Sequence, residues 1–258
     1  MRVISLNIWG GKFYEPLLEF IKASAPDTDF FCFQEVFDSK LKQINKDKSW
    51  YKIDILSDLI SALPNYKYYY SPAQENWPLP ETSTGLAIFA RNNIQINDQG
   101  ELFVYRTKNS IINGDDKTLP ANLQYVCFNS NGNDLTLAHV HGIYYPGSKL
   151  DTPDRIAQSQ RIVSFFQTKK TQNILCGDFN LMPDTQSVKL IENSGMKNLI
   201  KQFSIPTTRS DLNYAKYPGP EQQHFADYTF VSSGVNVLNF FVPPFPISDH
   251  LPLILDFD

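Results

Sequence analysis

Residues 174–180 read ILCGDFN, an apolar run that ends in an aspartate and an asparagine. Short, continuous apolar runs are typical of buried strands, and we predict a strand over Asn173–Gly177. In open α/β sheets, functional side chains gather beyond the carboxyl ends of the strands. The pattern therefore indicates a strand that carries Asp178 and Asn180 to one edge of a sheet.

Polar residues of catalytic type also end or open other predicted strands. They are Asn7, Glu35, His139, His141, Asp227, Asp249 and His250. A parallel or mixed sheet brings strand ends of one polarity to one edge, so we expect these side chains to converge. Carboxylates with histidines and amides suit a hard divalent cation bound through oxygen, with substrate phosphate completing its shell. They do not suit zinc, because no pair of histidines has the spacing found in zinc proteases.

Strands and helices alternate outward from this stretch in both directions. Apolar runs predict strands over 2–7, 30–34, 66–70, 85–90, 123–129, 135–141, 228–231, 235–242 and 251–257. Helical spacing of apolar residues predicts helices near 14–21, 56–63, 153–166 and 185–192. We predict irregular stretches at 71–83, 108–121 and 207–225. Nothing reads as a linker, so we predict a single α/β layered domain over residues 1–258.

The composition excludes several classes of protein. The 258 residues include 23 Lys and Arg and 27 Asp and Glu, a formal net charge of −4, and 42% are apolar. This excludes intrinsic disorder, and the acidic balance argues against indiscriminate binding to nucleic acid. Cys32, Cys127 and Cys176 lie in apolar runs and are predicted to be reduced core residues of a cytoplasmic protein. We find no membrane span or signal segment, so we expect no stable membrane insertion.

Six motifs occur in a fixed order along the chain. They are Leu6-Asn7-Ile8-Trp9-Gly10, Gln34-Glu35-Val36, His141-Gly142, Gly177-Asp178-Phe179-Asn180, Ala226-Asp227-Tyr228 and Ser248-Asp249-His250-Leu251-Pro252. With these motifs the sequence resembles the endonuclease/exonuclease/phosphatase superfamily, which has the deoxyribonuclease I-like fold. The resemblance covers essentially the whole chain. It implies an α/β (α+β) fold, a four-layer sandwich of two packed mixed β-sheets flanked by helices, with the site at one end between the sheets.

The resemblance also implies a metal site. Glu35 matches the metal-binding glutamate of the family, and Asn7 and Asp249 match residues near that ion. We therefore expect Mg²⁺ as the cofactor, with Mn²⁺ able to replace it.

Catalytic roles carry over in the same way. Asp178 matches the aspartate that aligns or deprotonates the attacking water, and Asn180 matches the amide that donates to a phosphoryl oxygen. His250 resembles the histidine that contacts the phosphate, and Asp227 matches the carboxylate that orients it. His141 fits the central histidine, proposed to contact the phosphate or to help the leaving group.

Three further residues are candidates for substrate binding. His139 stands two residues before His141 on the same predicted strand face, so both side chains could reach the site; the alternative is a packed histidine with a backbone partner. His224 either lines the cleft or is an ordinary loop residue. Arg209 lies in a long loop and is either solvated or bound to substrate phosphate.

Two features have mainly structural interpretations. Arg155 and Gln158, early in the predicted helix after His141, are expected to buttress the site, with direct phosphate contact as the alternative. A lysine-rich stretch at 40–48 is interpreted as a solvated face, with a contact for a polyanion or a membrane as the alternative.

These observations predict a divalent-metal-dependent phosphoesterase. We expect it to hydrolyse a phosphodiester, of nucleic acid or nucleotide type, by in-line attack of an activated water. Two alternatives stay open: a lipid or inositol-phosphate phosphatase or phospholipase C-type hydrolase similar to sphingomyelinase, and a catalytically inactive binding module of the same fold. The expected partner is the phosphate-ester substrate, nucleic acid being one candidate, and we expect a monomer.

Overall fold

Two six-stranded mixed sheets form the centre of the computed structural model, which describes residues 1–41, 51–216 and 222–258. The first sheet has the strand order β11-β12-β1-β2-β4-β3. Its strands are β1 (Arg2–Asn7), β2 (Phe30–Ser39), β3 (Tyr66–Glu75), β4 (Thr82–Arg91), β11 (Val237–Phe241) and β12 (Leu253–Phe257). β1 and β2 run parallel, and the other neighbours in this sheet are antiparallel.

The second sheet has the strand order β5-β6-β7-β8-β10-β9. Its strands are β5 (Ile96–Tyr105), β6 (Ala121–Ser130), β7 (Asn133–His141), β8 (Gln172–Asp178), β9 (Lys197–Asn198) and β10 (Asp227–Val231). Here β7 and β8 are the parallel pair, so each sheet contains one parallel step among antiparallel ones.

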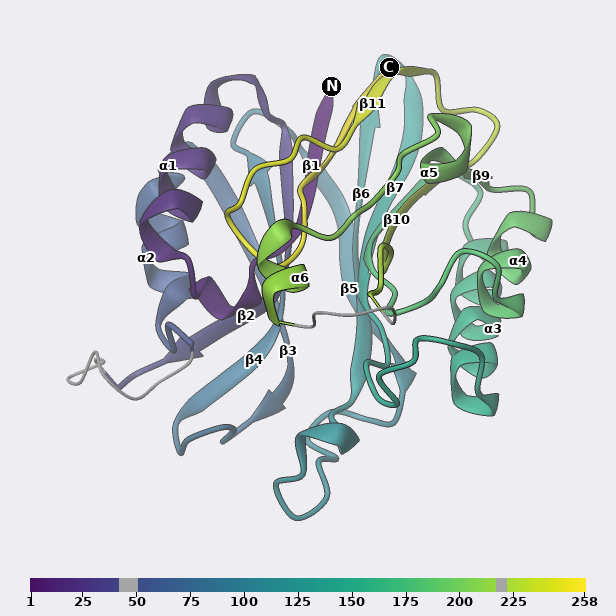
Figure 1. Cartoon of the computed structure of the whole chain (residues 1–258). Coiled ribbons are helices and arrows are strands. Elements are labelled where there is room, and N and C mark those ends of the chain that lie inside the picture. The colour runs from purple at the N-terminus through teal and green to yellow at the C-terminus, as the bar shows by residue number, and fades with distance from the viewer. Residues whose placement is uncertain (42–50, 217–221) are drawn as a thin grey trace.

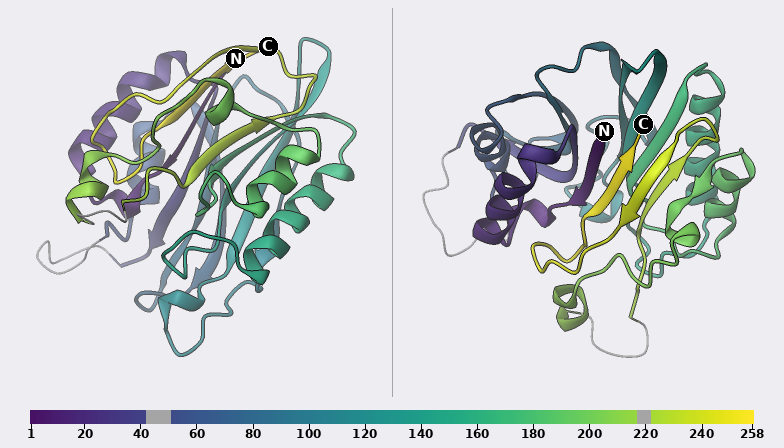
Figure 2. Two further views of the ribbon diagram at one scale, coloured as in Figure 1. Left: turned by 45° about the vertical axis from the view of Figure 1, so that its right-hand side comes forward. Right: turned by 90° about the horizontal axis from the view of Figure 1, so that it is seen from above.

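Helices cover the outer faces of both sheets (Figures 1 and 2). α1 (Tyr14–Ser24) and α2 (Ile55–Ala62) flank the first sheet, and α3 (Pro153–Gln167) and α4 (Gln186–Asn193) flank the second. The shorter α5 (Leu199–Gln202) and α6 (Asp211–Lys216) follow, with single 3₁₀ turns at Trp9–Gly11, Ala25–Asp27 and Asp116–Thr118. The predicted fold class, two packed mixed sheets flanked by helices, is confirmed.

The alternation of side chains along β2 explains why its apolar run is continuous. Phe30 and Cys32 belong to the core shared by the two sheets, whereas Phe31 and Phe33 belong to the core under α1 and α2. Phe30 meets Phe128 of the other sheet with ring centroids 4.7 Å apart. A strand buried on both faces needs apolar side chains at every position. Residues of both sheets thus contribute to one core.

Several boundaries differ from the sequence-based expectation. β5 was not predicted, because INDQGELFVY is an edge strand, next to β6 in the sheet, and its first six residues contain a single apolar side chain. The irregular stretch expected at 71–83 is shorter, since β3 continues to Glu75 and β4 begins at Thr82. The lysine-rich stretch lies mostly within 42–50, outside the described residues. Among the residues described, none of the helices has the length and apolar character to cross a membrane.

Candidate active site

Strand register brings three of the predicted residues to one level of the second sheet. Asp178, the last residue of β8, is paired with His141 of β7 on one side and with Asp227 of β10 on the other. Gly177 allows this close packing, because a Cβ atom there would lie 2.3 Å from the carbonyl oxygen of Val140. The convergence expected at one sheet edge is therefore found.

Asp178 is a buried carboxylate surrounded by donors and cations. Its Oδ1 accepts a hydrogen bond from the Asn180 backbone N–H at 2.9 Å, and its Oδ2 accepts one from Asn7 Nδ2 at 3.1 Å. Burial alone would raise the pKa of Asp178, but the positive charges of His250, His141, Arg209 and Lys149 outweigh burial and lower this pKa to about 2. Asp178 is therefore ionised at neutral pH.

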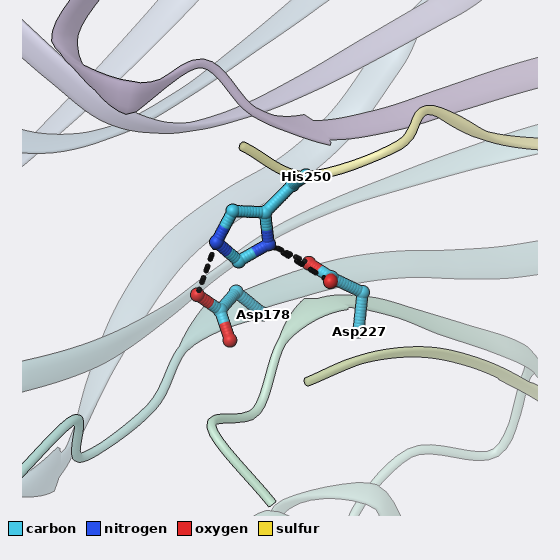
Figure 3. A group of neighbouring side chains, drawn as sticks. All are labelled: Asp178, Asp227 and His250. Carbon is cyan, nitrogen blue, oxygen red and sulfur yellow. Dashed lines mark hydrogen bonds and ion pairs between the residues drawn. The ribbon is translucent and has the colours of Figure 1, made fainter. Parts of the chain in front are cut away.

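His250 lies between two carboxylates (Figure 3). Its Nδ1 donates to both oxygens of Asp227, at 2.8 and 2.9 Å, and its Nε2 lies 3.6 Å from Asp178 Oδ2. Burial and the neighbouring Arg209 lower the pKa of His250, yet the carboxylates of Asp227, Asp178 and Asp249 together raise it above its ordinary value. Burial raises the pKa of Asp227 despite the opposing effect of His250. The bond to Asp227 fixes the orientation of the ring.

Glu35 reaches the same cavity through an irregularity in β2. The register between β2 and β4 shifts between Phe33 and Val36, and Glu35 has a φ of +57°. This bulge interrupts the alternation of side chains, so Gln34 is fully buried while Glu35 lines the cavity. Glu35 Oε1 accepts a hydrogen bond from Asn7 Nδ2 at 3.0 Å and lies 3.7 Å from His141 Nε2.

Two carboxylates thus converge where the sequence predicts a metal ion. Glu35 Oε1 and Asp178 Oδ2 share both Asn7 Nδ2 and His141 Nε2 as neighbours. Asp249, which is 7% exposed, also lines the cavity. Oxygen donors with clustered negative charge fit a hard divalent cation such as Mg²⁺ or Mn²⁺.

Asn7, which was expected near the metal ion, contacts both carboxylates. Its Oδ1 accepts a hydrogen bond from the backbone N–H of Trp9 at 2.9 Å, which turns Nδ2 toward the two carboxylates. Asn7 therefore positions Glu35 and Asp178 by donating to both of them.

The part of the chain described here also contains one group of side chains close enough to share an ion. Ligand atoms of Asp178, Asp227 and His250 lie within 4.8 Å of one another. The hydrogen bonds between His250 and Asp227 already account for much of this proximity. This group can hold and move a proton without any metal.

Glu35, Asp178 and His250 border a cavity of about 830 Å³. Arg209, a predicted substrate residue, lines it with 6% of its surface exposed, and its guanidinium Nη1 is hydrogen-bonded to His250 Nε2. Lys149 lines it too, and no motif in the sequence indicated this lysine. It lies in a Gly- and Ser-containing loop, where a lysine is normally solvated. Its ammonium donates instead to Asn180 Oδ1 and, at 2.9 Å, to the carbonyl of Tyr144.

His139 does not reach the cavity, contrary to the substrate-binding prediction. The ring is fully buried: Nδ1 accepts from Gln34 Nε2 and Nε2 donates to Gln124 Oε1, both at 2.9 Å. Side-chain amides take the place of the expected backbone partner. Although His139 and His141 share a strand face, His139 is two residues further inside the sandwich. Burial, with a smaller effect of His141, lowers the pKa of His139 to about 3.

His224, for which lining the cleft and an ordinary loop position were both open, does not line the cavity. Its ring is exposed, and its Nδ1 bonds the Tyr214 hydroxyl at 2.8 Å. The neighbouring Gln223 lines the cavity instead.

Arg155 and Gln158 have the expected buttressing contacts. The guanidinium of Arg155 donates to the carbonyls of residues 143, 144, 146 and 150. Gln158 Oε1 accepts a hydrogen bond from the backbone N–H of Ile143 at 2.8 Å. Both side chains are fully buried, and together they hold the segment that carries Lys149.

Comparisons with known proteins agree with this architecture. A search of curated protein sequences finds no match. Among solved structures, the chain is similar to a mannosyl-6-phosphatase of Bacteroides thetaiotaomicron, with 19% identity, a TM-score of 0.73 and 100% and 99% of the two chains covered. It is also similar to the catalytic domain of human Nocturnin, with 22% identity, a TM-score of 0.65 and coverage of 100% of this chain and 93% of that one. A humanised D. rerio TDP2 is similar too, with 13% identity, a TM-score of 0.70 and coverage of 100% and 98%.

The sequence itself matches a family profile from residue 4 to residue 250, nearly the whole chain. The matched range includes Glu35, Asp178 and His250, which line one cavity, and Asp227, which bonds His250. The chain belongs to the Endonuclease/Exonuclease/phosphatase family.

Proposed function

We propose that this protein is a divalent-metal-dependent hydrolase of phosphate esters that uses in-line attack of a water molecule. The family match supports a hydrolase acting on phosphate ester bonds. The observation that carries the proposal is the buried Asp178 carboxylate, which faces the His250–Asp227 pair and shares Asn7 with Glu35.

Asp178 aligns the attacking water. A carboxylate with a pKa of about 2 is a weak base, so it accepts a hydrogen bond from the water rather than removing its proton in the resting state. The proton becomes acidic as the oxygen attacks phosphorus, and Asp178 and His250 lie next to it.

Donors at the cavity stabilise the charge that develops on the phosphoryl oxygens. Asn180 Nδ2 uses one N–H on the carbonyl of Gly142 at 3.0 Å and keeps the other for a phosphoryl oxygen. His141 contributes a further donor, and His250, held by Asp227, is proposed to contact the phosphate. These side chains are fixed before substrate binds, so little reorganisation is needed in the transition state.

Glu35 and Asp249 are the residues proposed to hold the cation, with Asn7 orienting Glu35. A bound Mg²⁺ or Mn²⁺ would supply positive charge against the phosphoryl oxygens. We assign the Asp178, Asp227 and His250 group to proton handling, because Nδ1 of His250 already donates to Asp227.

The size of the cavity bears on the substrate. About 830 Å³ falls within the range of small-molecule sites. A groove for single-stranded nucleic acid needs basic groups along its length. Among the described residues, Lys149 and Arg209 are the lysine and arginine side chains that line the cavity, and both lie beside the catalytic residues. The cavity thus favours the nucleotide-type ester over a polymer. The experiment below distinguishes a phosphodiester substrate from a lipid or inositol phosphate, and an active enzyme from an inactive binding module.

A hydrolysis screen of the purified chain tests the proposal. The panel holds p-nitrophenyl phosphate, bis-p-nitrophenyl phosphate, nucleotides, DNA, RNA, a phosphoinositide and sphingomyelin, each with Mg²⁺, Mn²⁺, Ca²⁺ or EDTA. We expect EDTA-sensitive turnover that falls at least about 10²-fold in kcat for Asp178→Asn. Equal turnover by this variant, or no turnover of any substrate with any metal, contradicts the proposal.

Glu35→Gln tests the metal site separately. Loss of one carboxylate charge should raise the Mg²⁺ concentration needed for half-maximal activity, and excess Mg²⁺ should restore part of the rate. Wild-type behaviour of this variant at ordinary Mg²⁺ concentration contradicts the ligand role.

A further inference from the structure

Lys149 presents an ammonium group to the candidate active site, and no carboxylate among the described residues is hydrogen-bonded to it. The residue is 7% exposed, and both hydrogen-bond acceptors of its Nζ are neutral oxygens, those of Tyr144 and Asn180. Burial lowers the pKa of Lys149 to about 7, although Asp178 and Glu35 attract the ammonium. A buried cation that lacks a directly bound anion is costly in the free protein and is stabilised when an anion binds.

The position of Lys149 is built into the fold. Its φ is +59°, a left-handed conformation that costs energy for a residue with a side chain. Its carbonyl accepts from the Met182 N–H at 3.0 Å, and the carbonyls around it are held by Arg155. This scaffold holds the ammonium against Asn180, the amide next to the reacting phosphoryl group.

Arg209 supplies a second cation on the other side of the same group of residues. It is 6% exposed, contacts His250 through Nη1, and lies 3.9 Å from Asp249 Oδ2. Its buried Nε has no hydrogen-bond partner among the residues described. An unused, buried guanidinium donor that lines a cavity indicates a ligand with additional acceptor oxygens.

The number of donors is informative about the ligand. Lys149, Arg209, Asn180 and His250 all line the cavity in which the phosphoryl group is proposed to bind, in addition to the proposed cation. A phosphodiester offers one negative charge and two free oxygens, whereas a terminal phosphate carries a charge of about −1.5 to −2 and has three free oxygens. Two extra cations are therefore better matched to the terminal phosphate.

We propose that Lys149 and Arg209 form an anion-binding pair that selects terminal phosphomonoesters of small molecules over phosphodiesters. The inference rests on the proposed function. It replaces the phosphodiester substrate predicted from the sequence by a phosphomonoester, because the prediction did not take Lys149 into account. The reaction is the transfer of the phosphoryl group to water, which breaks the phosphorus–oxygen bond of the ester and releases an alcohol and inorganic phosphate.

The test compares p-nitrophenyl phosphate with methyl p-nitrophenyl phosphate, which share a leaving group and differ only by the methyl ester. With Mg²⁺ we expect the wild-type kcat/KM to favour the monoester by at least about 10²-fold. Lys149→Met should reduce this preference at least about 10-fold, and Lys149→Arg should restore part of it. Lys117→Met is the matched control: this exposed lysine lies 5.2 Å from the Tyr145 ring beside the cavity, and its loss should leave the preference unchanged.

Inorganic phosphate gives a second readout that does not require turnover. Calorimetry of the Mg²⁺-loaded protein should show phosphate binding that weakens at least about 10-fold in Lys149→Met and in Arg209→Lys. Thermal melting of each variant reports whether it is folded. If Lys149→Met does not fold, the phosphate affinities and ester preferences of Lys149→Arg and Arg209→Lys are compared with those of the wild type instead.

The outcomes separate the two proposals. Three outcomes overturn the anion-binding pair and leave the proposed hydrolase function intact. They are a wild-type preference for the diester, equal losses of kcat/KM on both esters in Lys149→Met, and unchanged phosphate affinity in the variants. Equal losses would mean that Lys149 only positions Asn180. Turnover that EDTA and Asp178→Asn do not affect would instead overturn the proposed function.

Discussion

Two buried histidines, His139 in the core and His250 in the candidate active site, have almost the same exposure and opposite chemistry. They are 0% and 3% exposed. Amides bond both ring nitrogens of His139, whereas carboxylates lie close to both nitrogens of His250. The pKa of His139 is lowered to about 3, and that of His250 is raised. Burial favours the neutral ring in both places, so the charge of the partners decides the difference.

The two regions also differ in how completely their donors are used. Both nitrogens of His139 are bonded, and Gln124 Nε2 donates onward to the Tyr69 carbonyl at 2.9 Å. The region of His250 borders a cavity of about 830 Å³ and contains the unpartnered Nε of Arg209. The core cluster stabilises the contact between the sheets, while the site keeps unused donors for a ligand.

The largest effect expected from this contrast is on catalysis at His250. His250→Ala should lower kcat about 10³-fold, because the ring is proposed to contact the phosphate and handle a proton. Asp227→Asn should lower it less, about 10- to 100-fold, since Asp227 acts by orienting the ring. Steady-state kinetics on the substrate found in the screen measures both. A kcat within threefold of wild type for His250→Ala contradicts the assignment.

His139→Ala should affect stability instead. Removing a buried ring leaves a cavity and unpaired amides, so we expect the free energy of unfolding to fall by about 3 kcal/mol. Denaturant titration measures this loss, and kcat should stay within threefold of wild type. A large loss of kcat with unchanged stability would reverse the comparison.

His141→Ala sharpens the comparison within a single strand. His141 lines the cavity, with its Nε2 3.8 Å from Asp178 Oδ2, so we expect kcat/KM to fall about 10²-fold. The change in stability should be smaller than that of His139→Ala because the ring is partly exposed. If His139→Ala reduced activity more than His141→Ala, the central histidine would be misassigned.

The smallest expected effect is a pH dependence of stability from His139. Its folded pKa of about 3 lies below the unfolded value of about 6.5, so the unfolded chain binds the additional proton and stability falls as pH falls between these values. From pH 7 to pH 5 this contributes a loss of about 2 kcal/mol. His139→Gln should lose correspondingly less over this interval in denaturant titrations. Identical pH dependence in both proteins contradicts the low pKa.

Local patterns in the sequence were enough to predict most of the fold. Apolar runs located most of the strands, because strands buried on both faces require continuous apolar residues. The helix predicted near 153–166 is α3, whose first turn is capped by the Thr152 hydroxyl, which accepts a hydrogen bond from the Arg155 N–H at 3.2 Å. β5 was missed because an edge strand tolerates polar residues and has no comparable signal.

For the site, the sequence by itself determined which residue types stand at the strand ends. Asp178, Asp227, His141 and His250 were predictable because strand polarity brings such ends together. Only the tertiary structure decided which of them face the cavity. The bulge in β2 buries Gln34 and turns Glu35 toward the cavity. His139 lies two residues further into the sandwich than His141 and bonds Gln34 instead of lining the cavity. The contacts of Arg155 hold the loop that places Lys149 at the cavity. These outcomes depend on contacts between segments distant in sequence, which no local pattern records.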